Sequence, residues 1–478
     1  MSAKGISEEA VEKFERMIAD AMMKLHVPGL SVALVRDGEV IYARGFGARN
    51  REENLPATPN TLYGIGSCTK SFTALAIMQL VERGKLSLED PVSKYLPIRV
   101  GSKEDPIRIH HLLTHSSGIP NLGVAEIIIG KMVGIEEKWI PMSSLEDLFL
   151  HINGAVEEVA ARPGERFFYF NTGYTLLGEI IERVSGVSYE EYVRENILKP
   201  LEMKRSTFLK EEFEKDPDIM TPYIVEEKDG EVAITPTKHP FHKFVYAAGG
   251  LLSSVMELSN YLTMNMNGGA FKGTRILDSS LLTQMHEIGI ESETLQAYYG
   301  RFGRTGYGYG WIIAEDFLGH KLVAHGGSTG VSSAHLSFIP DLKIGVAAAA
   351  NTGQGPVPVY LGALALLMGK DPEKEIPAIR IEKRLNMLAG VYESYKGIHR
   401  VSVVKRGALL FLESKERLWR IRAPLIPESE ELETLKFYIV AGPGQRFPVE
   451  FVVDPSGRVD LYLERHRLHK VGGLEALT

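Results

Sequence analysis

Apolar residues in the first 50 positions recur first with a helical period and then with a strand period. Residues 30–35 and 39–44 alternate as strands do, and Asp37-Gly38 between them favours a two-residue hairpin turn. Before this hairpin, apolar residues recur every three or four positions, which predicts an amphipathic helix. That spacing is carried by Val11, Phe14, Ile18, Met22 and Leu25.

A mostly helical stretch separates this hairpin from further strands. Residues 71–81 are apolar on nearly every side, which predicts a buried helix, and residues 172–185 and 258–266 also predict helices. Strand patterning returns at residues 307–313, 321–325, 334–339 and 344–350. We therefore expect an α+β fold, with an antiparallel sheet from distant segments, flanking helices and an inserted helical subdomain.

The pattern changes after about residue 368. Residues 369–387 are charged and contain prolines, which is typical of a linker. Short alternating runs with glycine and proline turns follow, which predicts a small all-β barrel or sandwich. We thus expect a catalytic domain at 1–368, a linker at 369–387 and a β domain at 388–478.

Composition narrows the function classes. The 478 residues are 44% hydrophobic and carry a net charge of -7. A nucleic-acid binder would usually show a dense run of lysine and arginine, and the sequence contains no such run. No apolar stretch has the roughly 18 residues of a membrane span. The N-terminus lacks the order of a secretory signal, and the lone Cys68 forms no intrachain disulfide. These features predict a cytoplasmic protein without a membrane or nucleic-acid partner.

The first candidate chemistry is Ser67-Cys68-Thr69-Lys70. A serine hydroxyl needs a base to become a nucleophile, and Lys70 would share a helix face with Ser67 if Ser67 opens the helix. Burial against the apolar helix would lower the pKa of Lys70 and let it act as that base. A Ser-x-x-Lys spacing also arises by chance, and Cys68 between them is expected to pack.

Two further motifs add polar groups. Tyr169 could relay a proton, and Asn171 could bind a substrate carbonyl or the lysine; alternatively Tyr169 packs and Asn171 caps a helix. His325-Gly326-Gly327-Ser328 ends an apolar strand, where the glycines would let a substrate approach an N–H that completes an oxyanion hole with that of Ser67. The alternative is an ordinary glycine turn.

Two further groups of residues have a structural role as an alternative to a functional one. His110, His111 and His115 look like a metal cluster, but no carboxylate is in register, and we expect neither a metal nor a cofactor. An aromatic-glycine segment precedes the His325 strand and could either wall the substrate cleft or pack on the body of the domain. Its aromatic residues are Tyr298, Tyr299, Phe302, Tyr307 and Tyr309.

Taken together and in this order, the three motifs resemble those of the serine β-lactamase and penicillin-binding-protein superfamily. Within it, the chain is similar to the class C-related branch of DD-peptidases, D-aminopeptidases, esterases and archaeal CubicO-type peptidases. The β domain resembles the lipocalin-like tails of some members. Further matching stretches are residues 84–91, 110–120, 171–174, 200–203, 248–251 and, in the β domain, 388–392.

The resemblance implies roles for these residues. Ser67 would form an acyl-enzyme, Lys70 and Tyr169 would exchange protons, and Asn171 would orient the substrate amide. The N–H groups of Ser67 and Ser328 would hold the oxyanion. His325 stands where β-lactamases usually have lysine, and a histidine is not a permanent cation.

The expected function is therefore hydrolysis of peptide or amide bonds in small peptides, with tolerance or preference for D-residues. A carboxylesterase is the alternative, and a β-lactamase or a non-catalytic scaffold is a weaker one. The CubicO resemblance and the short strands of the β domain favour a homo-oligomer, with a closed octamer-like assembly as one form.

Overall fold

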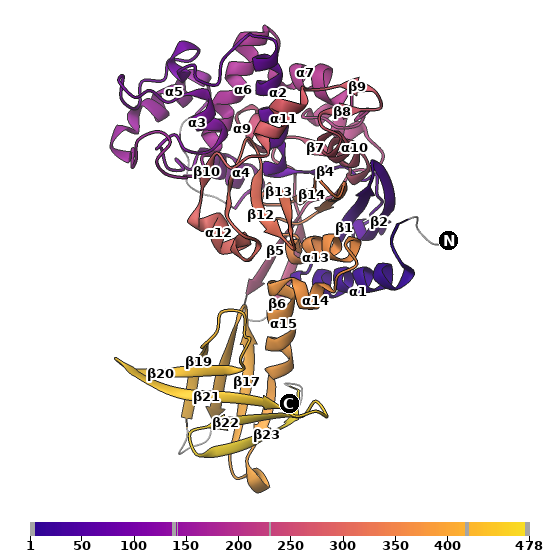
Figure 1. Ribbon diagram of the computed structural model, residues 1–478, viewed down its shortest axis with the longest axis vertical. Helices are drawn as coiled ribbons and strands as arrows, with labels where there is room; N and C mark the ends of the chain where they lie inside the picture. The colour runs from indigo at the N-terminus through magenta and orange to yellow at the C-terminus, as the bar shows by residue number, and fades with distance from the viewer. Residues whose placement is uncertain (1–4, 136–139, 141, 229–230, 416–419, 474–478) are drawn as a thin grey trace. The chain divides into compact units, whose positions relative to one another are not determined.

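The computed structural model describes residues 5–135, 140, 142–228, 231–415 and 420–473 (Figure 1). The chain divides into two compact units, Met1–Gly369 and Lys370–Thr478. Within the first unit, an antiparallel sheet has the described strand order β10-β11-β12-β13-β14-β15-β1-β2-β3. Its strands are β1 (Gly29–Arg36), β2 (Glu39–Asn50), β3 (Leu55–Pro56), β10 (Ile290–Glu291), β11 (Thr305–Tyr307), β12 (Ile312–Phe317), β13 (His320–Ser328), β14 (Ser333–Ile339) and β15 (Ile344–Ala350).

The sheet joins the two ends of the first unit. Strand β1 pairs with β2 on one side and with β15 on the other, so that Leu30 lies opposite both Phe46 and Ala350. Asp37 and Gly38 between β1 and β2 both have positive φ, 50° and 82°, as a hairpin turn of matching twist requires. The predicted antiparallel sheet from distant segments is confirmed.

Helices cover the sheet on both faces. Helix α10 packs against β1, β14 and β15, while α13 packs against β14 and β15 and is itself covered by α1 (Figure 1). Every residue of β14 and β15 is buried. Strand β15 is therefore apolar throughout, whereas β14 alternates the polar Ser333, His335 and Ser337 with apolar residues although both of its faces are covered. These helices are α1 (Glu8–Leu25), α10 (Val255–Met266) and α13 (Val357–Leu367).

The remaining helices of the first unit lie between β4 and β11 in the chain. Helix α2 is buried along almost its whole length and contacts α6, α7, α9 and α11. It is the buried helix that the apolar run at 71–81 predicts, and it lies at the centre of the predicted inserted helical subdomain. The helices are α2 (Thr69–Glu82), α3 (Ile109–Leu113), α4 (Val124–Val133), α5 (Leu145–Gly154), α6 (Asn171–Ser185), α7 (Tyr189–Val193), α8 (Lys210–Lys215), α9 (Lys243–Gly249), α11 (Ser279–Met285) and α12 (Glu293–Tyr299).

Small two-stranded sheets complete this part of the chain. β4 pairs with β7, β5 with β6 and β8 with β9. Their bounds are β4 (Tyr63–Gly64), β5 (Tyr223–Lys228), β6 (Glu231–Pro236), β7 (Leu252–Ser253), β8 (Ala270–Phe271) and β9 (Thr274–Arg275).

The single strand predicted at 307–313 is wrong. The chain forms β11 and β12 there, joined by a turn in which the Gly308 N–H donates to the Trp311 carbonyl at 2.8 Å. Gly310 has φ +75°, and a Cβ added to it would lie 2.7 Å from the Lys70 carbonyl oxygen. Gly310 thus lets this turn pass directly against the backbone of α2, a contact that strand periodicity does not reveal.

In the second unit, the described residues form a closed antiparallel barrel, with β16 pairing β23. Phe437, Phe451 and Tyr392 lie among its buried core residues. The predicted fold class, an α+β domain followed by a small β-barrel, is confirmed. The strands are β16 (Gly390–Glu393), β17 (Arg400–Arg406), β18 (Leu409–Lys415), β19 (Arg420–Pro427), β20 (Lys436–Gly442), β21 (Gln445–Val453), β22 (Val459–Leu463) and β23 (His466–Gly472).

The linker predicted at 369–387 is instead mostly helical. It forms α14 (Pro372–Glu375) and α15 (Pro377–Leu388), each with proline in its first turn. Proline there starts a helix rather than breaking it, since the first N–H groups of a helix have no internal partner. Leu385 and Leu388 of α15 are buried in the core of the barrel unit.

Candidate active site

Ser67 lies in a tight turn directly before the most buried helix. The turn η1 (Gly66–Cys68) leads into α2, so the regular helix begins two residues later than a helix opened by Ser67 would. Lys70 is in the first turn of α2, and its Nζ lies 3.0 Å from Ser67 Oγ. The predicted Ser67–Lys70 contact is therefore present in the structure.

Lys70 is fully buried and held by three acceptors. Besides Ser67 Oγ, its Nζ contacts Asn171 Oδ1 at 2.8 Å and the Ala248 carbonyl oxygen at 2.7 Å. Burial lowers the pKa of Lys70 from 10.5 to about 7, against the opposing charge of Glu126. A large share of Lys70 side chains is thus neutral near pH 7 and able to accept a proton.

Tyr169 faces the same pair. Its ring centre lies 4.8 Å from Lys70 Nζ. Burial raises the pKa of Tyr169, and the nearby Ser67 side chain only partly opposes the rise. The phenol therefore keeps its proton near neutral pH and can donate it.

His115 packs against Tyr169 and bonds to the backbone of the next residue. Its buried ring lies 4.2 Å from the Tyr169 ring, and its Nδ1 accepts from the Phe170 N–H at 3.0 Å. Burial and the charge of Lys70 hold the pKa of His115 well below its usual range. The His115 ring packs among the rings of Tyr169, Tyr174 and Tyr307. Among the residues the structure describes, no cluster of side chains is arranged to hold a metal.

The edge of β13 touches the nucleophile turn through two glycines. A Cβ added to Gly327 would lie 1.9 Å from the Ile65 carbonyl oxygen and 2.8 Å from the Ser67 nitrogen. Gly66 has φ +52°, and a Cβ on it would lie 2.4 Å from the Ser328 nitrogen. Both glycines are therefore needed to bring the backbone nitrogens of Ser67 and Ser328 to the same small region.

Gly326 does not share this constraint. The nearest atom to a Cβ added there is His335 Nδ1, at 3.9 Å. Gly327 thus makes room for the protein's own nucleophile turn, whereas Gly326 has free space beside it; that the glycines admit a substrate stays a prediction.

His325 lies inside the protein, at the end of the buried part of β13. It is 2% exposed, its Nε2 is 2.8 Å from the Tyr307 hydroxyl, and its Nδ1 is 2.6 Å from the Gly326 carbonyl oxygen. The carbonyl can only accept, so Nδ1 carries the proton and Nε2 accepts from Tyr307. Burial, together with the charge of Lys70, lowers the pKa of His325 to about 3. The imidazole ring is therefore neutral, and both of its nitrogens are hydrogen-bonded within the protein.

Asn171 is the first residue of α6, and both the oxygen and the nitrogen of its side-chain amide form hydrogen bonds. Its Oδ1 accepts from Lys70, while its Nδ2 donates to Glu126 Oε1 at 2.9 Å. Asn121 Nδ2 donates to the same carboxylate oxygen at 2.8 Å. Asn171 therefore joins Lys70 to Glu126 and is not the helix cap that its position in the sequence also allowed.

A cavity of about 50 Å³ opens at Ser67. Its polar lining comes from Ser67, Asn171, Ser328 and Thr329. None of the described residues that line it has a cationic side chain. The rest of the lining is apolar or glycine: Ala125, Ile129, Pro240, Val245, Ala248 and Gly249.

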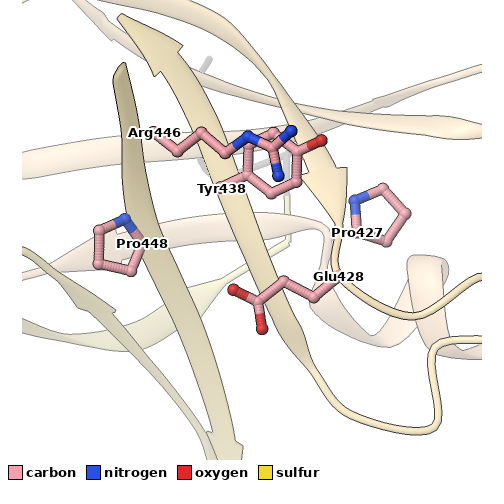
Figure 2. A pocket seen from close by; sticks show the side chains of 5 residues that line it. All are labelled: Pro427, Glu428, Tyr438, Arg446 and Pro448. Atoms are coloured by element: carbon pink, nitrogen blue, oxygen red, sulfur yellow. The ribbon is translucent and has the colours of Figure 1, made fainter. Parts of the chain in front are cut away.

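A larger hollow, about 330 Å³, lies on the barrel unit and has a different character. Figure 2 shows the Arg446 guanidinium over the ring of Tyr438, 4.5 Å from its centre, with Glu428 and two prolines around them. It contains no group that the Ser67 chemistry uses. We therefore assign the chemistry to the cavity at Ser67.

The sequence motifs did not indicate three of the groups found here. Glu126 comes from a helix without any motif, and Ala248 contributes only its carbonyl oxygen. Tyr307 belongs to the aromatic-glycine segment, where its buried hydroxyl bonds to His325, whereas Tyr298 of the same segment is 79% exposed. Tyr299, Phe302 and Tyr307 of the segment are buried, so the segment packs mainly on the body of the domain.

Comparison with known families agrees with this geometry. Residues 14–367 match the model named Beta-lactamase. The chain belongs to the Beta-lactamase family. Residues 372–469 match a second model, the Pab87 octamerisation domain. Among the described residues, no helix is long and apolar enough to cross a bilayer.

Three proteins illustrate what the chain is similar to. An octameric penicillin-binding protein homologue from Pyrococcus abyssi is 46% identical, with a TM-score of 0.86 over 96% of this chain and 100% of that one. Protein flp of Staphylococcus aureus is 28% identical over 87% of this chain and 76% of its own length. EstCE1, a hydrolase with promiscuous acyltransferase activity, shares the fold at 21% identity and TM-score 0.59 over 75% and 98% of the two chains.

Proposed function

We propose that the protein hydrolyses peptide or amide bonds of small peptides through an acyl-enzyme on Ser67, with tolerance for D-residues. The observation that carries the proposal is the buried Lys70, whose Nζ lies 3.0 Å from Ser67 Oγ and whose pKa burial lowers to about 7. A base of this pKa is matched to neutral pH, where general base catalysis is most effective.

In the proposed acylation step, neutral Lys70 takes the proton of Ser67 as Oγ attacks the substrate carbonyl carbon. The oxyanion that forms would be held by the N–H groups of Ser67 and Ser328, which the close contact of Gly66 and Gly327 supports. The leaving amine takes a proton from Tyr169, and the Lys70 ammonium restores it. Water then cleaves the ester, with the proton transfers reversed.

His325 acts in this proposal as a positioning residue. Both its nitrogens are bonded within the protein, so it contributes no cation to a substrate. Its role would be to hold the Gly326 carbonyl and thereby the β13 edge that carries Ser328. This also argues against efficient β-lactamase activity, which would use a cation for the β-lactam carboxylate.

An esterase is the second candidate, since the Ser67–Lys70 pair alone suffices for a leaving group that departs without a proton. Tyr169→Phe separates the two. An amine must be protonated to leave, so we expect this variant to lose about 100-fold in kcat/KM for amides and less than tenfold for a matched ester.

The measurement is turnover of D- and L-aminoacyl amides, short peptides and an ester by wild type and Ser67→Ala. The proposal expects amide turnover that Ser67→Ala abolishes, together with covalent attachment of a serine-reactive phosphonate to Ser67. Turnover of esters alone would favour the esterase, and equal rates for Ser67→Ala and wild type would refute both.

We also propose that the chain forms a homo-octamer. Support comes from the match of residues 372–469 to an octamerisation domain and from the octameric homologue that is 46% identical over 96% of this chain. The particle in solution would then have eight times the 53.0 kDa mass of the chain.

A further inference from the structure

The charges around the Ser67 cavity are the starting point. Lys70 titrates near neutral pH and is enclosed by three acceptors, and the neutral His325 faces Tyr307. The described residues that line the cavity add no cation. A substrate carboxylate would therefore find no fixed positive partner next to the acyl site.

A fixed negative group lies one side chain away. Glu126 is exposed, on the first turn of α4, and Ala125 and Ile129 of the same helix line the cavity. Its Oε1 is held by two amides, from Asn121 and Asn171, which fix the carboxylate beside the cavity. Two neutral amides orient the carboxylate without neutralising its charge, and the Lys70 ammonium on which it acts is partly deprotonated near pH 7.

Resting on the proposed function, we propose that Glu126 binds the ammonium group of the substrate, so that the enzyme acts on peptides with a free amino terminus. The α-ammonium of an aminoacyl group is two bonds from the carbonyl carbon that Ser67 attacks, and Glu126 is linked to the Ser67–Lys70 pair by Asn171 alone. The ligand class is thus an amino-terminal residue with its free ammonium, and substrates acylated on nitrogen are disfavoured.

The decisive variant is Glu126→Gln. Glutamine keeps a carbonyl oxygen for the Asn121 and Asn171 amides and removes only the charge. The measured quantity is the ratio of kcat/KM for D-alanyl p-nitroanilide to that for its N-acetyl derivative, since the two share the leaving group. We expect a ratio well above one in wild type and a fall of about tenfold or more in Glu126→Gln.

Two controls separate a charge effect from a structural one. Glu227→Gln, an exposed glutamate on β5, should leave the ratio unchanged. Raising the pH through about 8, where an α-amino group loses its proton, should lower the ratio in wild type and not in Glu126→Gln.

A binding experiment can measure the same preference for a free amino group. D-alaninamide should protect Ser67 from the phosphonate at a lower concentration than N-acetyl-D-alaninamide, and Glu126→Gln should remove the difference. Equal ratios in wild type and Glu126→Gln, or preference of wild type for the acetylated substrate, would overturn the assignment. Phosphonate labelling of Ser67 would show in that case that the proposed acyl-serine chemistry still stands.

Discussion

At the scale of single residues, Lys70 sets the expected pH dependence. Only the neutral amine accepts the Ser67 proton, and burial lowers the pKa of Lys70 to about 7. We expect kcat/KM for an N-acetyl ester, which does not titrate itself, to fall about tenfold per pH unit below 7 and to level above it. A stopped-rate assay between pH 5 and 9 measures this. Lys70→Arg, whose guanidinium keeps its proton, should show no rising limb, and a flat profile in wild type would remove Lys70 as base.

The two glycines of the β13 motif give a second residue-scale prediction. Gly327→Ala places a Cβ 1.9 Å from the Ile65 carbonyl oxygen and should displace the nucleophile turn, with a loss of kcat of about 100-fold or more. Gly326→Ala meets nothing closer than 3.9 Å and should retain activity within a few-fold. Steady-state kinetics on one ester compares them, and equal losses would contradict the assigned contact.

At the scale of elements, β14 and α13 meet at a buried histidine. His335 is fully buried, its ring stacks 5.6 Å from that of Tyr360 on α13, and neither nitrogen has a hydrogen-bond partner among the described residues. His335→Phe keeps the ring and removes two unsatisfied polar atoms, so we expect a higher free energy of unfolding at pH 7, by about 1 kcal/mol or more. Thermal unfolding of the two proteins checks this.

The same contact should respond to acid. Burial lowers the pKa of His335 to about 4 from its usual 6.5. The unfolded chain therefore takes up this proton first, and stability falls as the pH drops from 6.5 towards 4. His335→Phe should show a shallower fall over this range than wild type. Identical slopes would mean that His335 is protonated, or partnered, in the folded protein.

At the scale of the whole molecule, the barrel unit exposes apolar side chains that a lone particle would leave in water. Val440 on β20 and Phe447 on β21 are 58% and 48% exposed, and β20 and β21 pair with each other. In the proposed octamer, a second copy of the chain would cover them. Val440→Lys with Phe447→Lys should lower the mass measured by analytical ultracentrifugation, while the same change at exposed Arg422 and Arg420 should not. An unchanged octamer would place the interface elsewhere.

The sequence alone was enough to predict what repeats along it. Strand alternation predicted the sheet and the barrel, and three short motifs predicted the group around Ser67. The sequence did not predict features that depend on a contact between segments far apart in the chain. The turn between β11 and β12 passes against the backbone of α2 at Gly310, and Pro372 and Pro377 begin helices in a segment whose composition is typical of a linker. Glu126 reaches the site from a helix without a motif, so only the fold brings it to Asn171.

The three acceptors around Lys70 Nζ determine how proton loss changes the site. An ammonium has three hydrogens, one each for Ser67, Asn171 and Ala248. A neutral amine has two hydrogens and one lone pair. The Ala248 carbonyl can only accept, and Asn171 is held with its oxygen towards Lys70 because its NH₂ group donates to Glu126. Ser67 is the one neighbour of the three that can donate in turn, so the lone pair of the deprotonated amine points at its hydroxyl, and loss of one proton is enough to arm the nucleophile.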